Sequence, residues 1–169
     1  MPRLSIFWKT LRDLRWQVFW YGIGLALMAT FVVYLYPSYS EQLKDFKIPE
    51  ALKPFVGNLE IASPSGFLSA EFFSWAPIIL VIYAIMAGTS VLAGEEANGT
   101  MDLLLAQPIS RSRLALEKVA AFAISSCVIA GIVVLGWLTS VPFVEIDIGW
   151  DRLLLATANV VPITLFFGA

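Results

Sequence analysis

The distribution of charge constrains this chain more than any other feature of its sequence. Charged residues are absent between Arg15 and Glu41, between Glu71 and Glu95, between Lys118 and Glu145, and from Leu153 to the last residue. Each of the first three gaps exceeds the roughly 20 apolar residues that a helix needs to cross a bilayer core. With 59% hydrophobic and only 14% charged residues, the composition also differs from that of a soluble domain. The sequence therefore predicts an all-α integral membrane protein.

Four membrane-spanning helices are expected, because a helix satisfies its backbone hydrogen bonds internally in lipid. We place them in one transmembrane domain, 1–169, at 18–36, 72–92, 119–141 and 153–169, joined by loops at 37–71, 93–118 and 142–152. The fourth run is short for a span and ends without a polar stop. We interpret the chain as an incomplete piece of a longer polytopic protein, with a naturally short last helix as the alternative.

Two segments outside the spans have patterns of their own. Residues 1–17 combine apolar and basic residues at a spacing near one helical turn, which predicts an amphipathic interfacial helix on the inner leaflet. The alternative is that the first span simply continues outward as a straight helix with a basic end. Residues 37–71 contain several prolines and glycines, which favour short helices such as 49–53 in a small extracytoplasmic cap.

Basic residues are unevenly divided between the two sides of the predicted bundle. One side holds Arg3, Lys9, Arg12, Arg15, Arg111, Arg113 and Lys118, and the other holds Lys44, Lys47, Lys53 and Arg152. The positive-inside rule therefore places the N-terminus and the 93–118 segment in the cytoplasm of a multi-pass cell-membrane protein.

Small residues one turn apart indicate where helices can approach closely. Ala84 and Gly88 form such a pair on the second span, and Ala123 and Cys127 on the third. Ordinary packing within the bundle and a dimer interface are both compatible with these faces.

Several functions are disfavoured by residues that the spans lack. The spans contain no charged side chain, the kind of group that carriers and channels keep at bilayer depth. The chain has no histidine and a single cysteine, so we expect no catalytic residue, no metal site and no cofactor. An intramembrane enzyme is disfavoured, because the spans contain no paired acids, no Ser/Lys pair and no His-rich metal ligands. A net charge of -2 argues against nucleic acid. Energy for any transport must then come from another subunit.

The polar segment 93–118 reads AGEEANGTMDLLLAQPISRSRLALEK and separates the second and third spans. We expect its acids near a helix start, where the backbone dipole favours them, then an apolar helical patch at 101–106 that Pro108 ends. Ser110 can cap a new helix that carries Arg111 and Arg113 in its first turn. A short helix of this kind can dock in a partner's groove. The segment has no phosphate-binding loop, so ATP is not expected to bind here.

The run IMAGTSVLAGEEANGTMDLLLAQPISRSRLALEK resembles the signature of type-2 ABC exporter permeases. The ordered features are a helix-ending AGEE, a GT pair, an acid followed by leucines, a proline and a Ser-Arg pair. The segment SPSGFLSAEFF also resembles the outer approach to the second span in that family. The resemblance implies an α-helical bundle of six spans, four of them visible here. Its partners would be membrane lipid, a second permease in a homodimer or heterodimer, and cytoplasmic ABC ATPase subunits that bind ATP and Mg.

The resemblance also implies a role for the 93–118 segment as the coupling helix that sits in a cleft of the ATPase. The residues carried over to that contact are Glu95, Glu96, Gly99, Thr100, Asp102, Leu103, Leu104, Leu105, Pro108 and Arg111. Their role would be transmission of movement rather than catalysis. The expected function is the membrane-spanning permease subunit of an ATP-driven ABC exporter. The alternative is a non-transporting membrane anchor or scaffold for a cytoplasmic partner.

Overall fold

A computed structural model describes residues 5–44, 63–97, 99, 110–144 and 148–168, with the side chains of 5, 41–44, 91–97 and 111 left undescribed. The helices are α1 (Ser5–Lys44), α3 (Pro64–Glu71), α4 (Ala76–Ala97), α6 (Arg111–Val144) and α7 (Trp150–Gly168). In these parts of the chain there is no strand, and four helical stretches are long and apolar enough to cross a membrane. The prediction of an all-α chain with four potential spans is confirmed.

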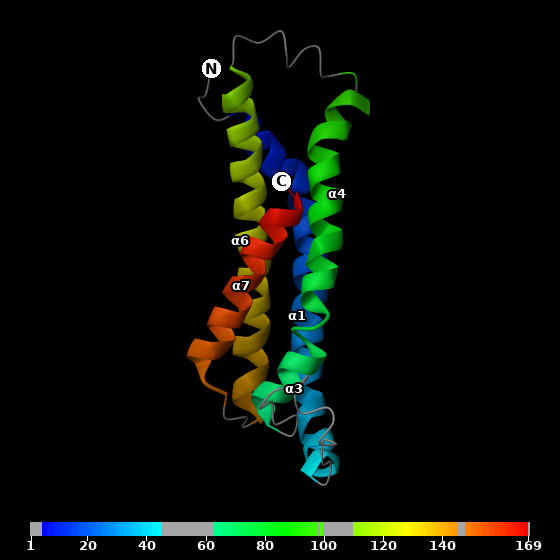
Figure 1. The fold of residues 1–169 in the computed structure, drawn as a ribbon, viewed down its shortest axis with the longest axis vertical. Coiled ribbons are helices and arrows are strands. Elements are labelled where there is room, and N and C mark those ends of the chain that lie inside the picture. The colour runs from blue at the N-terminus through cyan, green and yellow to red at the C-terminus, as the bar shows by residue number, and fades with distance from the viewer. Residues whose placement is uncertain (1–4, 45–62, 98, 100–109, 145–147, 169) are drawn as a thin grey trace, which may run out of the picture.

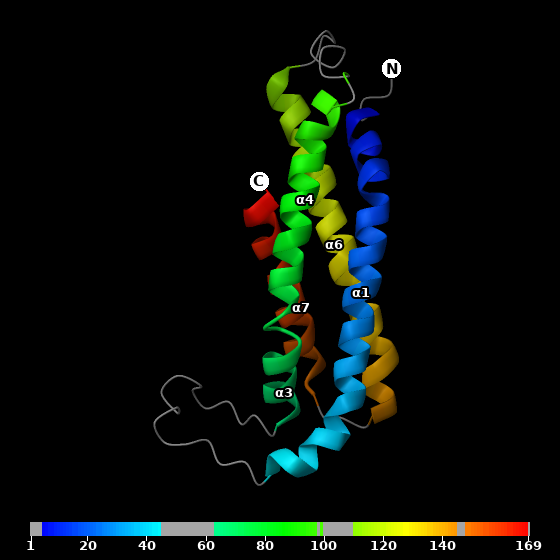
Figure 2. The same ribbon diagram turned by 90° about the vertical axis from the view of Figure 1, so that its right-hand side faces the viewer.

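The long helices run alternately up and down along one axis (Figures 1 and 2). α1 packs most extensively against α6, and α7 packs against both α4 and α6. The beginning of α1, the end of α4 and the beginning of α6 lie at the same end of the bundle (Figure 1). We call this the N-terminal end. α3 lies at the opposite end, beside the last turns of α1.

α1 is one continuous helix across the boundary that was expected near residue 17. The sequence offers no reason to stop there, because no glycine or proline occurs between Ser5 and Tyr21. A separate helix that ends near residue 17 is therefore wrong, and α1 continues without interruption into the span, with its first turns inclined to the rest of the helix (Figure 1). Contact of its first turns with a membrane surface stays a prediction.

The helices also extend beyond the predicted spans at several other ends. α1 continues through Pro37 to Lys44, so the first residues of the expected 37–71 loop are helical. Pro37 lies inside this helix, where proline removes one backbone hydrogen bond and favours a kink, and Figure 2 shows the last turns of α1 bending away from the rest. α4 reaches Ala97, α6 includes Pro142, and α7 begins at Trp150, before the expected start of the fourth span.

α3 is a short helix that directly precedes α4, the second span. Ser63 is its N-cap, and the Ser63 hydroxyl accepts a hydrogen bond of 3.1 Å from the Gly66 N–H. Pro64 occupies the first turn, where a missing N–H costs nothing. The predicted short helix at 49–53 lies outside the described residues.

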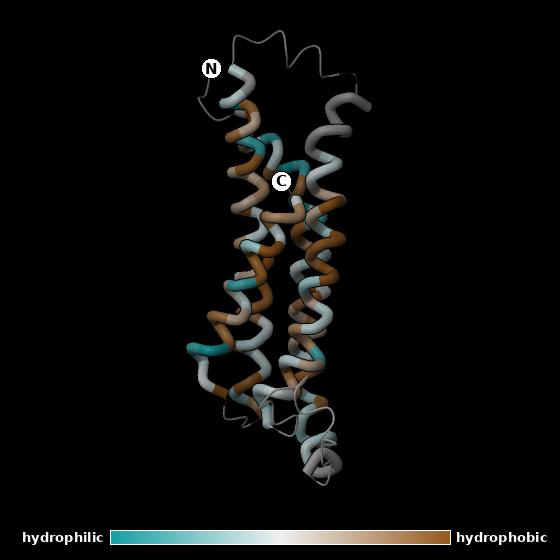
Figure 3. The backbone as a smooth tube through the Cα atoms, in the orientation of Figure 1, coloured by the Kyte–Doolittle hydropathy of each residue, from teal (hydrophilic) through white to brown (hydrophobic). Residues whose placement is uncertain are grey.

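The bundle is apolar inside and out, as expected for a protein in lipid. Figure 3 shows hydrophobic residues along the middle of the helices, with the most hydrophilic residues mainly toward the ends. The interior is closely filled, and a cavity among α1, α4, α6 and α7 measures about 20 Å³. That cavity has room for a single water molecule and not for an organic substrate.

Close helix packing occurs at glycines, although only partly at the predicted pairs. A Cβ on Gly88 would lie 2.9 Å from the carbonyl oxygen of Gly168, and Ala84 is fully buried, so the predicted α4 face is a packing face. Cys127 is exposed, so its pair with Ala123 is not a packing face within the chain, and a dimer interface at this face stays a prediction. A close approach of α6 to the backbone of α1 lies further along, at Gly136, where a Cβ would lie 2.9 Å from the carbonyl oxygen of Ala26.

Candidate coupling site

The 93–118 segment begins with the end of α4. The backbone of Glu95 and Glu96 lies in the last turn of this helix, which ends at Ala97. Gly99 follows with a φ of 64°, the left-handed conformation that commonly closes a helix. The expectation of acids near a helix start is therefore wrong. At a helix C-terminus each acid costs about 0.3–1 kcal/mol, so the position of this pair does not serve the helix.

The segment ends where α6 begins. The Ser110 carbonyl accepts hydrogen bonds of 3.1 Å from the N–H groups of both Arg113 and Leu114. Ser110 thus occupies the N-cap position, and α6 starts at Arg111, as the sequence predicted. The Ser112 hydroxyl donates to the Ser110 hydroxyl over 3.3 Å.

The residues between these two helix ends carry most of the predicted partner contact. Thr100, Asp102, Leu103, Leu104, Leu105 and Pro108 lie outside the described residues. Glu95, Glu96 and Arg111 have described backbone only. Contact of this whole set with a partner stays a prediction, and the described flanks define how the segment enters and leaves the bundle.

Glu117 joins the beginning of α6 to the beginning of α1. Its Oε1 accepts a hydrogen bond of 2.9 Å from Nε of Arg113, one turn earlier in α6. Its Oε2 accepts from the Phe7 N–H over 3.3 Å. Phe7 is the third residue of α1, so its amide has no acceptor within that helix. The carboxylate therefore caps α1 from a neighbouring helix and balances the positive end of its dipole.

Of the two contacts of Glu117, only the one with Arg113 could be predicted from the sequence. The four-residue spacing of Arg113 and Glu117 on a helix predicts the ion pair. The contact with Phe7 joins residues 110 positions apart, and no local pattern specifies it. Glu117 is thus a residue of the site that sequence reasoning missed.

Substitution of Glu117 by alanine is expected to lower the free energy of unfolding by about 1–2 kcal/mol. The change removes a helix cap worth about 1 kcal/mol and a partly exposed ion pair worth up to about 1 kcal/mol. Thermal unfolding in mild detergent measures the effect. Asp13→Ala is the control, because Asp13 is an exposed acid on α1. Equal melting temperatures for the two variants would contradict the role of Glu117.

The described residues offer no catalytic or metal-binding constellation. Among them, no group of three or more His, Cys, Asp or Glu side chains could hold a metal ion. At the N-terminal end, the beginning of α1, the end of α4 and the beginning of α6 lie at the same end of the bundle, and the Glu117 carboxylate links α1 to α6.

The chain matches the family described as ABC-2 family transporter protein over residues 4–169, almost its full length. It therefore belongs to the ABC-2 family of transporter proteins, which confirms the resemblance. No curated protein and no solved structure matched it. Membership makes the chain a multi-pass membrane component of an ABC transporter. Such a subunit is not itself catalytic and binds no cofactor, and the family generally works with an ATPase partner.

Proposed function

We propose that this chain is the permease subunit of an ATP-driven exporter, and that residues 93–118 couple it to cytoplasmic ATPase subunits. ATP and Mg²⁺ bind to those subunits, and a second permease, identical or different, completes the membrane part. The single observation that carries the proposal is the family match over residues 4–169. The helices that flank the segment, α4 and α6, support the proposal further, because they can transmit movement.

The acidic pair supports a partner contact at this segment. Glu95 and Glu96 lie at the end of α4 where their charge opposes the helix dipole. A charge that is unfavourable in the free helix becomes favourable when a cationic surface covers it. These residues therefore serve a docking role better than a structural one.

The continuity of α4 and α6 supports transmission. Both helices run from the segment through the bundle without interruption in the described backbone. Because packed helices move as rigid elements, displacement at the segment shifts the membrane portions of both. Glu117 extends this movement to α1 through the Phe7 amide.

The proposed orientation has the N-terminal end in the cytoplasm. Arg12, Arg15 and Arg113 are exposed at this end, and Arg152 is exposed at the opposite one. The excess of basic residues at the N-terminal end agrees with the positive-inside rule.

The test reverses both acids, Glu95→Lys with Glu96→Lys, in permease co-expressed with its ATPase subunit. We expect the amount of transport per ATP hydrolysed to fall at least tenfold, because two attractive charges become repulsive. Co-purification of the ATPase and transport into proteoliposomes are measured together. The matched control, Glu60→Lys with Glu71→Lys, makes the same charge change in the expected outer loop.

Two outcomes would count against the proposal. Unchanged ATPase binding and unchanged coupling in the double variant would remove the segment from the contact. ATP turnover that responds to no candidate substrate, or a partner without ATPase activity, would instead favour the anchor or scaffold.

A further inference from the structure

We propose that the first turns of α1 form a binding site for the phosphate headgroup of an anionic phospholipid, with Arg12 and Arg15 as its principal cations. The inference goes beyond the proposed transport function. It requires only that α1 crosses the membrane, and neither the direction of transport nor an ATPase enters it.

The membrane-facing stripe of α1 leads directly to these cations. Trp16, Trp20, Leu27 and Phe31 are 59%, 66%, 64% and 62% exposed, and at 3.6 residues per turn they share one face. Arg12 continues this face one turn before Trp16, toward the N-terminal end. The face thus changes along its length from phenylalanine and leucine to tryptophan to arginine, the order in which a helix meets acyl chains, interface and headgroups.

The side chains near Arg12 can hold a phosphate. A surface hollow is lined by Trp8, Lys9, Leu11 and Arg12, so it combines two cations with an apolar wall. The Arg15 guanidinium lies 5.9 Å from the centre of the Trp16 ring, which holds it beside the aromatic belt. Guanidinium groups bind phosphate oxygens in pairs, and their apolar stems tolerate contact with lipid.

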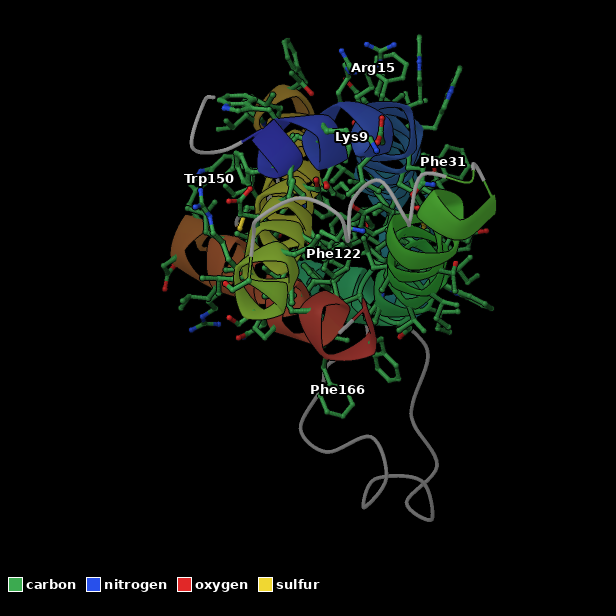
Figure 4. All side chains as sticks on the ribbon, turned by 90° about the horizontal axis from the view of Figure 1, so that it is seen from above. Lys9, Arg15, Phe31, Phe122, Trp150 and Phe166 are labelled. Carbon is green, nitrogen blue, oxygen red and sulfur yellow. The ribbon has the colours of Figure 1, made fainter. Side chains whose placement is uncertain are left out.

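Charge and exposure favour a lipid over a buried protein contact. Figure 4, viewed from the N-terminal end, shows Arg15 on the outer side of α1, away from α4, α6 and α7. Asp13 is the one acid between residues 5 and 40, so the basic residues of these turns are in excess. An anionic headgroup meets this surface with complementary charge, and each basic residue near such a membrane raises binding about fivefold.

The native tryptophans provide the test. The whole chain is reconstituted in phosphatidylcholine vesicles with a fixed fraction of phosphatidylglycerol, and bromines that quench tryptophan are placed near the headgroup of one lipid or the other. We expect stronger quenching by brominated phosphatidylglycerol. Arg12→Gln should reduce this preference about fivefold, whereas Arg152→Gln, the same charge change at the opposite end, should leave it unchanged.

A second variant shows whether the signal comes from this face. Replacing Trp8, Trp16 and Trp20 by phenylalanine should remove the preferential quenching, because these are the tryptophans of the hollow and the stripe, while Trp75, Trp137 and Trp150 still report on both lipids. Equal quenching by the two lipids, equal effects of Arg12→Gln and Arg152→Gln, or a preference that survives without Trp8, Trp16 and Trp20 would each overturn the site. So would an Arg12→Gln variant that loses the ATPase subunit and keeps its lipid preference, since the face would then belong to a protein partner.

Discussion

Alanine in place of Gly136 is expected to lower the free energy of unfolding by about 2–3 kcal/mol, toward the upper end of the range for overpacking. The added Cβ would lie 2.9 Å from the carbonyl oxygen of Ala26 and 3.1 Å from its Cα. Both are backbone atoms of α1, so no side chain can rotate to make room. The two helices must separate along the most extensive helix pairing of the bundle. Thermal unfolding in mild detergent measures the loss.

Gly131 supplies the control on the same helix. A Cβ at this position meets nothing within 4 Å, so Gly131→Ala changes helix propensity without changing the packing. Alanine is favoured over glycine inside a helix by about 1 kcal/mol, and we expect this variant to be at least as stable as the wild type. If Gly136→Ala and Gly131→Ala had the same melting temperature, α1 and α6 would not approach closely at this point.

The number and approximate position of the spans could be predicted from the sequence because charge in lipid is expensive. A charged side chain at the centre of a helix in the bilayer costs about 2.5–3.5 kcal/mol on insertion scales, so long uncharged runs are a strong signal. The C-terminal ends of the helices gave no such signal. α4 runs past Glu95 and Glu96 because charged residues outside the bilayer do not stop a helix, and α1 continues past Pro37 to Lys44 although proline disfavours a helix interior.

Lateral contacts between helices could be predicted only in part. The Ala84 and Gly88 face was recognisable, since small residues at one-turn spacing permit close approach. The same pattern at Ala123 and Cys127 does not mark a contact within the chain, because Cys127 is on the exposed side of α6, and the predicted dimer interface there stays open. Spacing identifies a smooth face of a helix, but the packing of the whole bundle decides which faces meet.

The candidate site shows the same division between local and tertiary information. The start of α6 after Ser110 followed from local capping chemistry. The placement of Glu95 and Glu96 at a helix end rather than a start depended on how far α4 continues. The Glu117 contact with Phe7 depended on α1 lying beside α6. A single sequence contains no direct signal for either of these two features.

Truncation of Trp137 to alanine is expected to cost about 3 kcal/mol of unfolding free energy, the low end of the range for aromatic-to-alanine changes in cores. In soluble proteins, part of that cost is the transfer of the side chain from water into the core. This part is absent for a helix in lipid, because lipid tails are as apolar as the core. The rest of the free-energy cost comes from lost packing contacts, and Trp137 makes several of them. It is fully buried, its ring centre lies 4.8 Å from that of Phe72, and its Nε1–H donates to the Thr157 hydroxyl over 3.3 Å. One side chain of α6 thereby joins the entry to α4 and the middle of α7.

Two further variants separate the packing of Trp137 from its hydrogen bond. Trp137→Phe keeps most of the ring contact and loses the bond to Thr157, so we expect a cost of about 1 kcal/mol. Trp75→Ala is the control for removing a tryptophan, because Trp75 is 56% exposed and its loss opens no cavity. Unfolding is followed by thermal denaturation with a probe other than tryptophan fluorescence. Equal melting temperatures for Trp137→Ala and Trp75→Ala would mean that α7 is held against the bundle by contacts other than this one.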